Sequence, residues 1–85
     1  MSEKEAKQEA QRIVEECSKL TIGTITIGFS VLERKAFTLD KVQSNIDLLE
    51  KTANYLDESR LLASATILRH KVGNLKQVKA QIELL

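Results

Sequence analysis

Hydrophobic residues recur at alternating steps of four and three along most of the chain, which is the spacing of one face of an amphipathic helix. The first set consists of Ala6, Ala10, Ile13, Cys17 and Leu20. Ser2 and Glu5 stand at the start of this set with the spacing of a capping box, in which a hydroxyl and a carboxylate bond each other's backbone N–H groups. The pattern predicts a helix that begins at residue 3.

Two further segments, residues 38–57 and 59–84, show the same spacing. Their apolar positions are Val42, Ile46, Leu49, Ala53 and Leu56 in the first segment, and Leu61, Ala65, Leu68, Val72, Leu75 and Ile82 in the second. Thr38 is a candidate N-cap for the first segment, and a short polar link, residues 57–60, joins the two. Two amphipathic helices joined by so few residues predict an antiparallel helical hairpin.

Lys79 interrupts the apolar face of the last predicted helix, between Leu75 and Ile82. A polar residue at such a position can set the register or the oligomeric state of a helical assembly. Alternatively the apolar face shifts to Val78, Ile82 and Leu85, and the lysine extends its ammonium group to solvent. The second interpretation is favoured because it needs no partner for a buried charge.

Residues 20–37 fit two structures. Ile25, Ile27, Phe29 and Val31 alternate with other residues at the period of a strand, which favours a strand or a hairpin that turns near Gly28. The same segment also continues the helical spacing on two faces. Because little else in the chain resembles a partner strand, the sequence favours one long helix over residues 3–37, with residues 20–31 as the part that could form strand.

The fold class predicted is therefore all-α: a coiled-coil-like bundle of three helices in a single domain that spans residues 1–85. The absence of proline among the 85 residues agrees with long helices, because an interior proline costs a helix about 3 kcal/mol. A helix over residues 3–37 would be roughly 50 Å long, and helices of 20–25 residues only about 30–37 Å. The two shorter helices could therefore not cover both apolar faces of the long helix.

This mismatch predicts a homo-oligomer, since closed symmetric assemblies are the commonest way to bury such a surplus. The chain is 42% hydrophobic but short, and a small domain removes only about 60–65% of its unfolded surface from water. The predicted interface lies in the most apolar segment and consists of Ile22, Ile25, Ile27, Phe29, Val31 and Leu32.

Catalytic chemistry is thinly represented. His70 is the single histidine and lies between two cationic residues, and Cys17 is the single cysteine, on the apolar face of the first helix. Neither belongs to a pattern with metal-ligand spacing, and residues 23–30 lack the lysine that follows the second glycine of a phosphate-binding loop. We expect no enzyme activity, no cofactor and no metal site, with Cys17 as a small buried hydrophobic residue.

Charge is balanced overall, with 13 basic and 12 acidic residues. The last 25 residues are mildly basic but form no continuous basic stripe, so a nucleic-acid-binding regulator that uses residues 69–79 is kept as a third functional hypothesis and a nucleic-acid partner is not favoured. Residues that could contact a ligand or partner are Tyr55, Arg60, Arg69, Lys76 and Lys79. The longest apolar run, residues 20–32, is too short to cross a bilayer, and no signal peptide precedes it, so we expect an intracellular, cytoplasmic protein.

The function that these features favour is that of a small non-enzymatic homo-oligomer, an inhibitor or adaptor that binds a protein partner. A second hypothesis is a binder of nucleotide-like ligands at helix–helix interfaces. Residues 53–68 carry a loose motif, Asp57, Ser59, Arg60, Ala63, Ala65 and Thr66. This motif resembles the small phage-encoded anti-CBASS sponge proteins, helical oligomers that sequester cyclic nucleotides. The resemblance covers less than a fifth of the chain, and no site residue is transferred from it.

Overall fold

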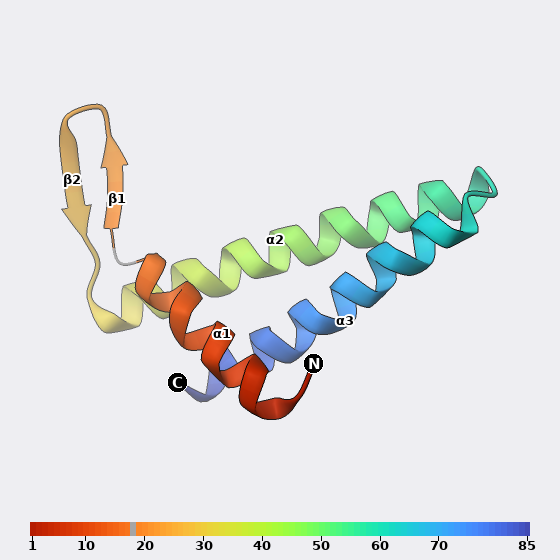
Figure 1. The fold of residues 1–85 in the computed structure, drawn as a ribbon. Helices are drawn as coiled ribbons and strands as arrows, with labels where there is room; N and C mark the ends of the chain where they lie inside the picture. The colour runs from red at the N-terminus through yellow and green to blue at the C-terminus, as the bar shows by residue number, and fades with distance from the viewer. Residues whose placement is uncertain (18) are drawn as a thin grey trace.

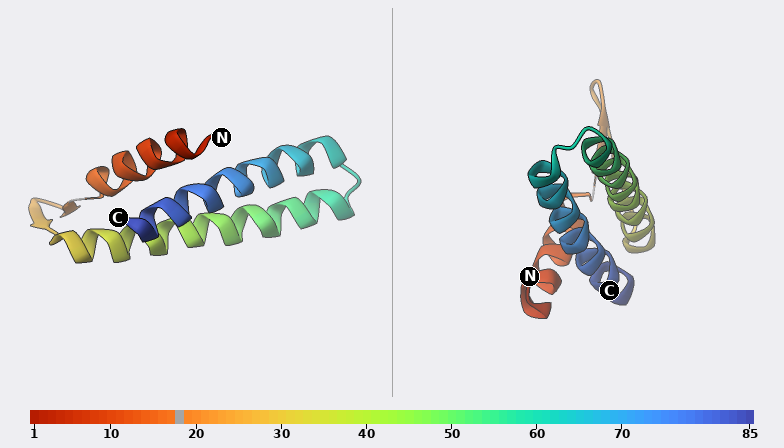
Figure 2. Two further views of the ribbon diagram at one scale, coloured as in Figure 1. Left: turned by 90° about the horizontal axis from the view of Figure 1, so that it is seen from below. Right: turned by 90° about the vertical axis from the view of Figure 1, so that its right-hand side faces the viewer.

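The computed structural model describes residues 1–17 and 19–85. In chain order the elements are helix α1 (Glu3–Glu16), strands β1 (Lys19–Ile22) and β2 (Ile25–Gly28), helix α2 (Val31–Glu58) and helix α3 (Leu62–Leu84). Helices α2 and α3 run antiparallel, and α1 packs mainly against α3 near the end opposite the α2–α3 turn (Figures 1 and 2). The two strands form a separate hairpin that stands away from the helices (Figure 1). The predicted, mostly helical class with three packed helices is confirmed.

A capping box fixes where α2 begins. The Ser30 hydroxyl accepts a hydrogen bond from the Glu33 backbone N–H at 3.3 Å, and the Glu33 carboxylate accepts one from the Ser30 N–H at 3.0 Å. The helix therefore begins at Val31, before the predicted start at residue 38. Thr38 is not an N-cap: it is fully buried inside α2, where its hydroxyl donates to the Arg34 carbonyl oxygen at 2.6 Å.

The prediction of one helix over residues 3–37 was wrong, and the strand alternative is correct for residues 19–28. Helix α1 ends at Glu16, and the chain turns at Gly23 and Thr24, not near Gly28. Gly23 has a φ of +62°, and a positive φ at the first of two loop residues is the arrangement of a type II′ turn, which suits the twist of a hairpin. Threonine and isoleucine on both sides favour strand.

The register of the hairpin separates apolar from polar side chains. Ile22 pairs with Ile25 and Thr21 with Thr26, and residues directly opposite one another in an antiparallel pair share a face. Ile22, Ile25 and Ile27 therefore lie on one face. The threonines lie on the other, where their hydroxyl oxygens are 3.2 Å apart.

The hydrophobic core lies where the three helices meet. Its buried members are Ala6, Ala10, Val42, Ile46, Val72, Val78 and Ile82. Val78 is buried, whereas Lys79 is only half-buried and donates to the Gln43 side-chain carbonyl at 2.6 Å. Val78 and Ile82 are thus buried as the favoured interpretation predicted, whereas Leu85, which it also placed on the apolar face, is 48% exposed. Cys17 was predicted to be a small buried hydrophobic residue. It is instead half-buried at the end of α1 and does not belong to the core.

The turn between α2 and α3 is a Schellman motif. The Arg60 backbone N–H donates to the Asp57 carbonyl at 3.0 Å, and the Leu61 N–H donates to the Leu56 carbonyl at 2.8 Å. Arg60 has a φ of +63°, a left-handed conformation that glycine adopts without steric cost. An arginine here keeps the motif at the expense of local strain.

Replacing Arg60 by glycine should raise the free energy of unfolding by about 0.5–1 kcal/mol, because the left-handed backbone would no longer hold a Cβ atom. Arg60→Ala keeps the Cβ atom and should leave stability near that of the parent protein. Urea denaturation followed by circular dichroism distinguishes them. If the glycine variant is no more stable than the alanine variant, the left-handed backbone at residue 60 is not strained by its Cβ atom.

Candidate functional site

The most exposed apolar region lies on the strand hairpin and the first turn of α2, and we refer to it as the hairpin surface. Its members and their exposed fractions are Ile22 (63%), Ile25 (65%), Ile27 (49%), Val31 (71%) and Leu32 (81%). Residues 20–32 of the sequence include no charged residue. Five of the six residues predicted as an oligomer interface are thus exposed, and they lie in an uncharged stretch of the sequence.

Val31 is exposed because α2 extends beyond the helix that covers it. It lies two helical turns before the buried Thr38, so it continues the core-facing stripe of α2. The Lys35 ammonium group donates to the Glu83 carbonyl oxygen at 2.7 Å, which places the last turn of α3 beside Lys35. The first turn of α2 therefore has an apolar stripe but no helix opposite it.

Phe29, the sixth residue of the predicted interface, has a different environment. It is half-buried, and its ring centroid lies 5.3 Å from that of Phe37 with the two planes tilted by 46°. The Lys41 ammonium group lies 5.3 Å from the Phe37 centroid, within the range of a cation–π contact. Phe29 therefore joins the base of the hairpin to α2.

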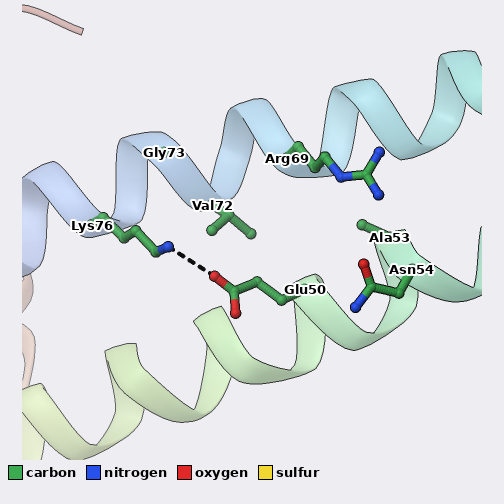
Figure 3. A pocket seen from close by; sticks show the side chains of 7 residues that line it. All are labelled: Glu50, Ala53, Asn54, Arg69, Val72, Gly73 and Lys76. Atoms are coloured by element: carbon green, nitrogen blue, oxygen red, sulfur yellow. Dashed lines mark ion pairs between the residues drawn. The ribbon is translucent and has the colours of Figure 1, made fainter. Parts of the chain in front are cut away.

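The second candidate site is a hollow between α2 and α3, about halfway along the pair, which we refer to as the interhelical groove. It has a volume of about 370 Å³ and is lined by Glu50, Ala53, Asn54, Arg69, Val72, Gly73 and Lys76 (Figure 3). Lys76 forms an ion pair with Glu50 at 2.9 Å, and Arg69 pairs with Asp57 at 2.9 Å. Small residues of both helices leave the space that defines the groove.

The groove contains two of the five residues predicted to contact a ligand, Arg69 and Lys76. The other three lie outside its lining. Tyr55 is 68% exposed on α2, and Arg60 is in the turn beyond it. Lys79 lies one helical turn after Lys76, where it bonds Gln43 and comes within 4.0 Å of Glu83. The structure does not gather the predicted set at one place.

Titratable groups form ordinary surface interactions. On α1, Arg12 donates hydrogen bonds to Glu9 and Glu16, which lie three residues before it and four residues after it, the spacings of neighbours on a helix surface. The hydrogen bond from Arg12 holds the pKa of the Glu9 carboxyl below its usual value, and the two carboxylates raise the pKa of Arg12. His70 is exposed. Among residues 1–17 and 19–85, no three His, Cys, Asp or Glu side chains are grouped so that they could hold a metal ion.

The sequence did not reveal the α2 side of the groove, Glu50 and Asn54. Both residues resemble ordinary solvent-side positions of an amphipathic helix, and only the pairing of the two helices places Glu50 opposite Lys76 and Asn54 near Arg69. The signal that was available is Gly73, a glycine inside a predicted helix, which often marks a close approach to the backbone.

Comparisons with protein-family models, with curated proteins and with solved structures found no match to this chain. The resemblance of residues 53–68 to the sponge proteins stays a prediction. In the part of the chain that the structure describes, no helix is both long and apolar enough to span a membrane.

Proposed function

We propose that the protein is a small, non-enzymatic interaction protein of regulatory type, which assembles into a homo-oligomer through the hairpin surface and in that form binds a protein partner. The observation that carries this proposal is the exposed, uncharged set Ile22, Ile25, Ile27, Val31 and Leu32. Several large apolar side chains exposed near one another in the sequence mark an interaction site more often than a single exposed residue does.

The size of this surface suits a second copy of the chain. Taking on the order of 100 Å² for each fully exposed aliphatic side chain, the five residues expose roughly 300 Å² of apolar surface. Two copies would bury about twice that, and because about 65% of a homodimer interface is apolar, the whole interface would cover about 1,000 Å². That is near the lower limit for a biological interface and below the roughly 1,200–2,000 Å² of stable complexes, so we expect assembly to depend strongly on protein concentration.

The composition of the surface also suits a second copy. A two-fold interface brings the same patch of both subunits together, so a charged patch would meet its own charge. The isoleucine face of the hairpin avoids this repulsion, since residues 20–32 carry no charge. We place the isoleucine faces of two hairpins against each other, with the threonine faces turned to solvent.

Assembly in this way leaves the outer face of α2 free for a different protein. Leu48 and Tyr55 lie seven residues apart, hence on one face, and are 62% and 68% exposed. Helix faces of this kind supply the aromatic and aliphatic anchors of protein interfaces. We assign partner binding to this face and assembly to the hairpin surface.

The assembly is tested by replacing Ile25 and Ile27 together with aspartate. The parent protein should show a mass above 9.6 kDa by light scattering, rising with concentration, and the double variant should be monomeric with an unchanged far-UV circular dichroism spectrum. Each aspartate would meet the like charge of its copy in a desolvated interface.

Thr26→Asp is the matched control, because Thr26 lies between the two isoleucines on the opposite face of the same strand. It adds a charge to the hairpin without entering the proposed interface, so the oligomer should persist. A parent protein that is monomeric at every concentration, or a Thr26→Asp variant that dissociates as fully as the double variant, would refute the proposed assembly.

A further inference from the structure

We propose that the interhelical groove binds a small organic anion, a phosphate or carboxylate that carries an apolar group. The anionic end would lie at the Arg69 guanidinium group, and the apolar group would lie on Ala53, Val72 and Gly73. This inference rests on the groove alone and does not depend on assembly through the hairpin surface.

The groove has the dimensions and the lining of a small-molecule site. Its volume of about 370 Å³ falls within the usual range for ligand pockets, roughly 300–1,000 Å³. Ala53 and Val72 are buried and form an apolar floor, while Arg69 and Lys76 extend from α3 toward α2 on either side of that floor (Figure 3). Asn54 extends into the same space from α2 (Figure 3).

Gly73 is the residue that the fold itself does not explain. A glycine inside a helix costs about 1 kcal/mol relative to alanine. Within the described residues, a Cβ atom built at Gly73 would meet no atom within 4 Å, so packing inside the chain does not require glycine there. Glycine is, however, the residue that lets a ligand approach a backbone closely. Gly73 is exposed and lines the groove, so a molecule bound there could approach its backbone closely.

The groove offers an anion two cationic side chains, and the carboxylate of Glu50 lines the same space. Arg69 and Lys76 lie four residues before and three residues after Gly73, so both are on its side of α3. Their ion pairs with Asp57 and Glu50 are solvent-exposed, with side chains 43–60% accessible. Exposed pairs of this kind contribute little to stability, so a ligand anion can replace the carboxylates at low cost. A guanidinium group matches the geometry of carboxylate and phosphate oxygens.

The test is titration calorimetry with two probes, phenyl phosphate and benzoate, at low ionic strength. Saturable binding of either probe at one site per chain is expected, and the tighter of the two identifies the preferred anionic group. Arg69→Ala should weaken that binding at least about tenfold, since a hydrogen bond between charged groups would be lost. Lys71→Ala removes an exposed lysine that lies two residues after Arg69 on the same helix, and it should leave binding unchanged.

Gly73→Ala separates this proposal from a structural role for the glycine. The variant should melt about 4 °C higher or more, because alanine favours the helix and meets no neighbour, and yet bind the probe at least about tenfold more weakly. Three results would overturn the proposal: no saturable binding of either probe, equal loss of binding in Lys71→Ala and Arg69→Ala, or full binding in Gly73→Ala.

Discussion

Replacing Ile46 by alanine should lower the free energy of unfolding by about 2–5 kcal/mol. Ile46 is 2% exposed, lies near the middle of α2 and belongs to the core cluster shared by all three helices. The variant loses the transfer free energy of the removed atoms and leaves a cavity that packed helices fill only in part. For a small domain this loss is a large share of the total stability, on the order of 5–15 kcal/mol.

Urea denaturation followed by circular dichroism measures this effect, and Leu48→Ala is its control. Leu48 is two residues further along the same helix, so the two variants share a similar change in side-chain size and helical context, but it is 62% exposed. Its replacement should change the free energy of unfolding by no more than about 0.5 kcal/mol. Similar losses in the two variants would mean that α2 does not use the face described here to contact its neighbours.

The sequence predicted that α2 and α3 pair as helices because their apolar spacing fits a helix and not a strand, although α2 begins seven residues before the predicted start. The steps of four and three through Val42, Ile46 and Ala53 name residues that are buried in the structure. The shift from Lys79 to Val78 was also predictable, because a buried ammonium group without a partner costs more than a gradual shift of the apolar stripe.

The segment before α2 was harder because its residues satisfy two periodicities. Ile25 and Ile27 fit a strand, and Ile25 with Phe29 also fits a helix, so hydrophobic spacing alone could not decide between them. Local hydrogen bonding decides instead. The Ser30–Glu33 capping box begins a new helix, and Gly23 supplies the turn of the hairpin. The spacing of the box was visible in the sequence and should have weighed against a helix continuous through residue 30.

The two candidate surfaces differ in how far the sequence could predict them. The hairpin surface follows from composition, because an uncharged apolar segment exceeds what a small chain can cover, whichever secondary structure it adopts. The groove depends on residues from α2 and α3 that are 15 or more positions apart, such as Asn54 and Arg69, which only the packing of the helices brings together.

Helix α1 makes contact with the other helices mainly through small side chains. Ala6 and Ala10 are 2% and 0% exposed, and Ile13 and Val14 pack partly against the same core. Methyl groups let α1 approach α3 closely, but each contributes little apolar area. A single helix of 14 residues is only marginally stable in water when it is not packed against other elements. The structure of α1 therefore depends on its contact with α3.

Ala10→Asp should separate α1 from the α2–α3 pair, because it would bury a carboxylate with no partner in an apolar contact, at a cost that the small α1 interface cannot offset. Since α1 supplies 14 of the residues in the three helices and α2 and α3 supply 28 and 23, we expect the far-UV helical signal to fall by up to about a fifth while a cooperative unfolding transition remains. Gln11→Asp places the same charge one residue further on, at an exposed position, and should keep the full signal. Loss of all helical signal in Ala10→Asp would show that α2 and α3 need α1 to fold, and an unchanged signal would show that α1 is stable without its contact with α3.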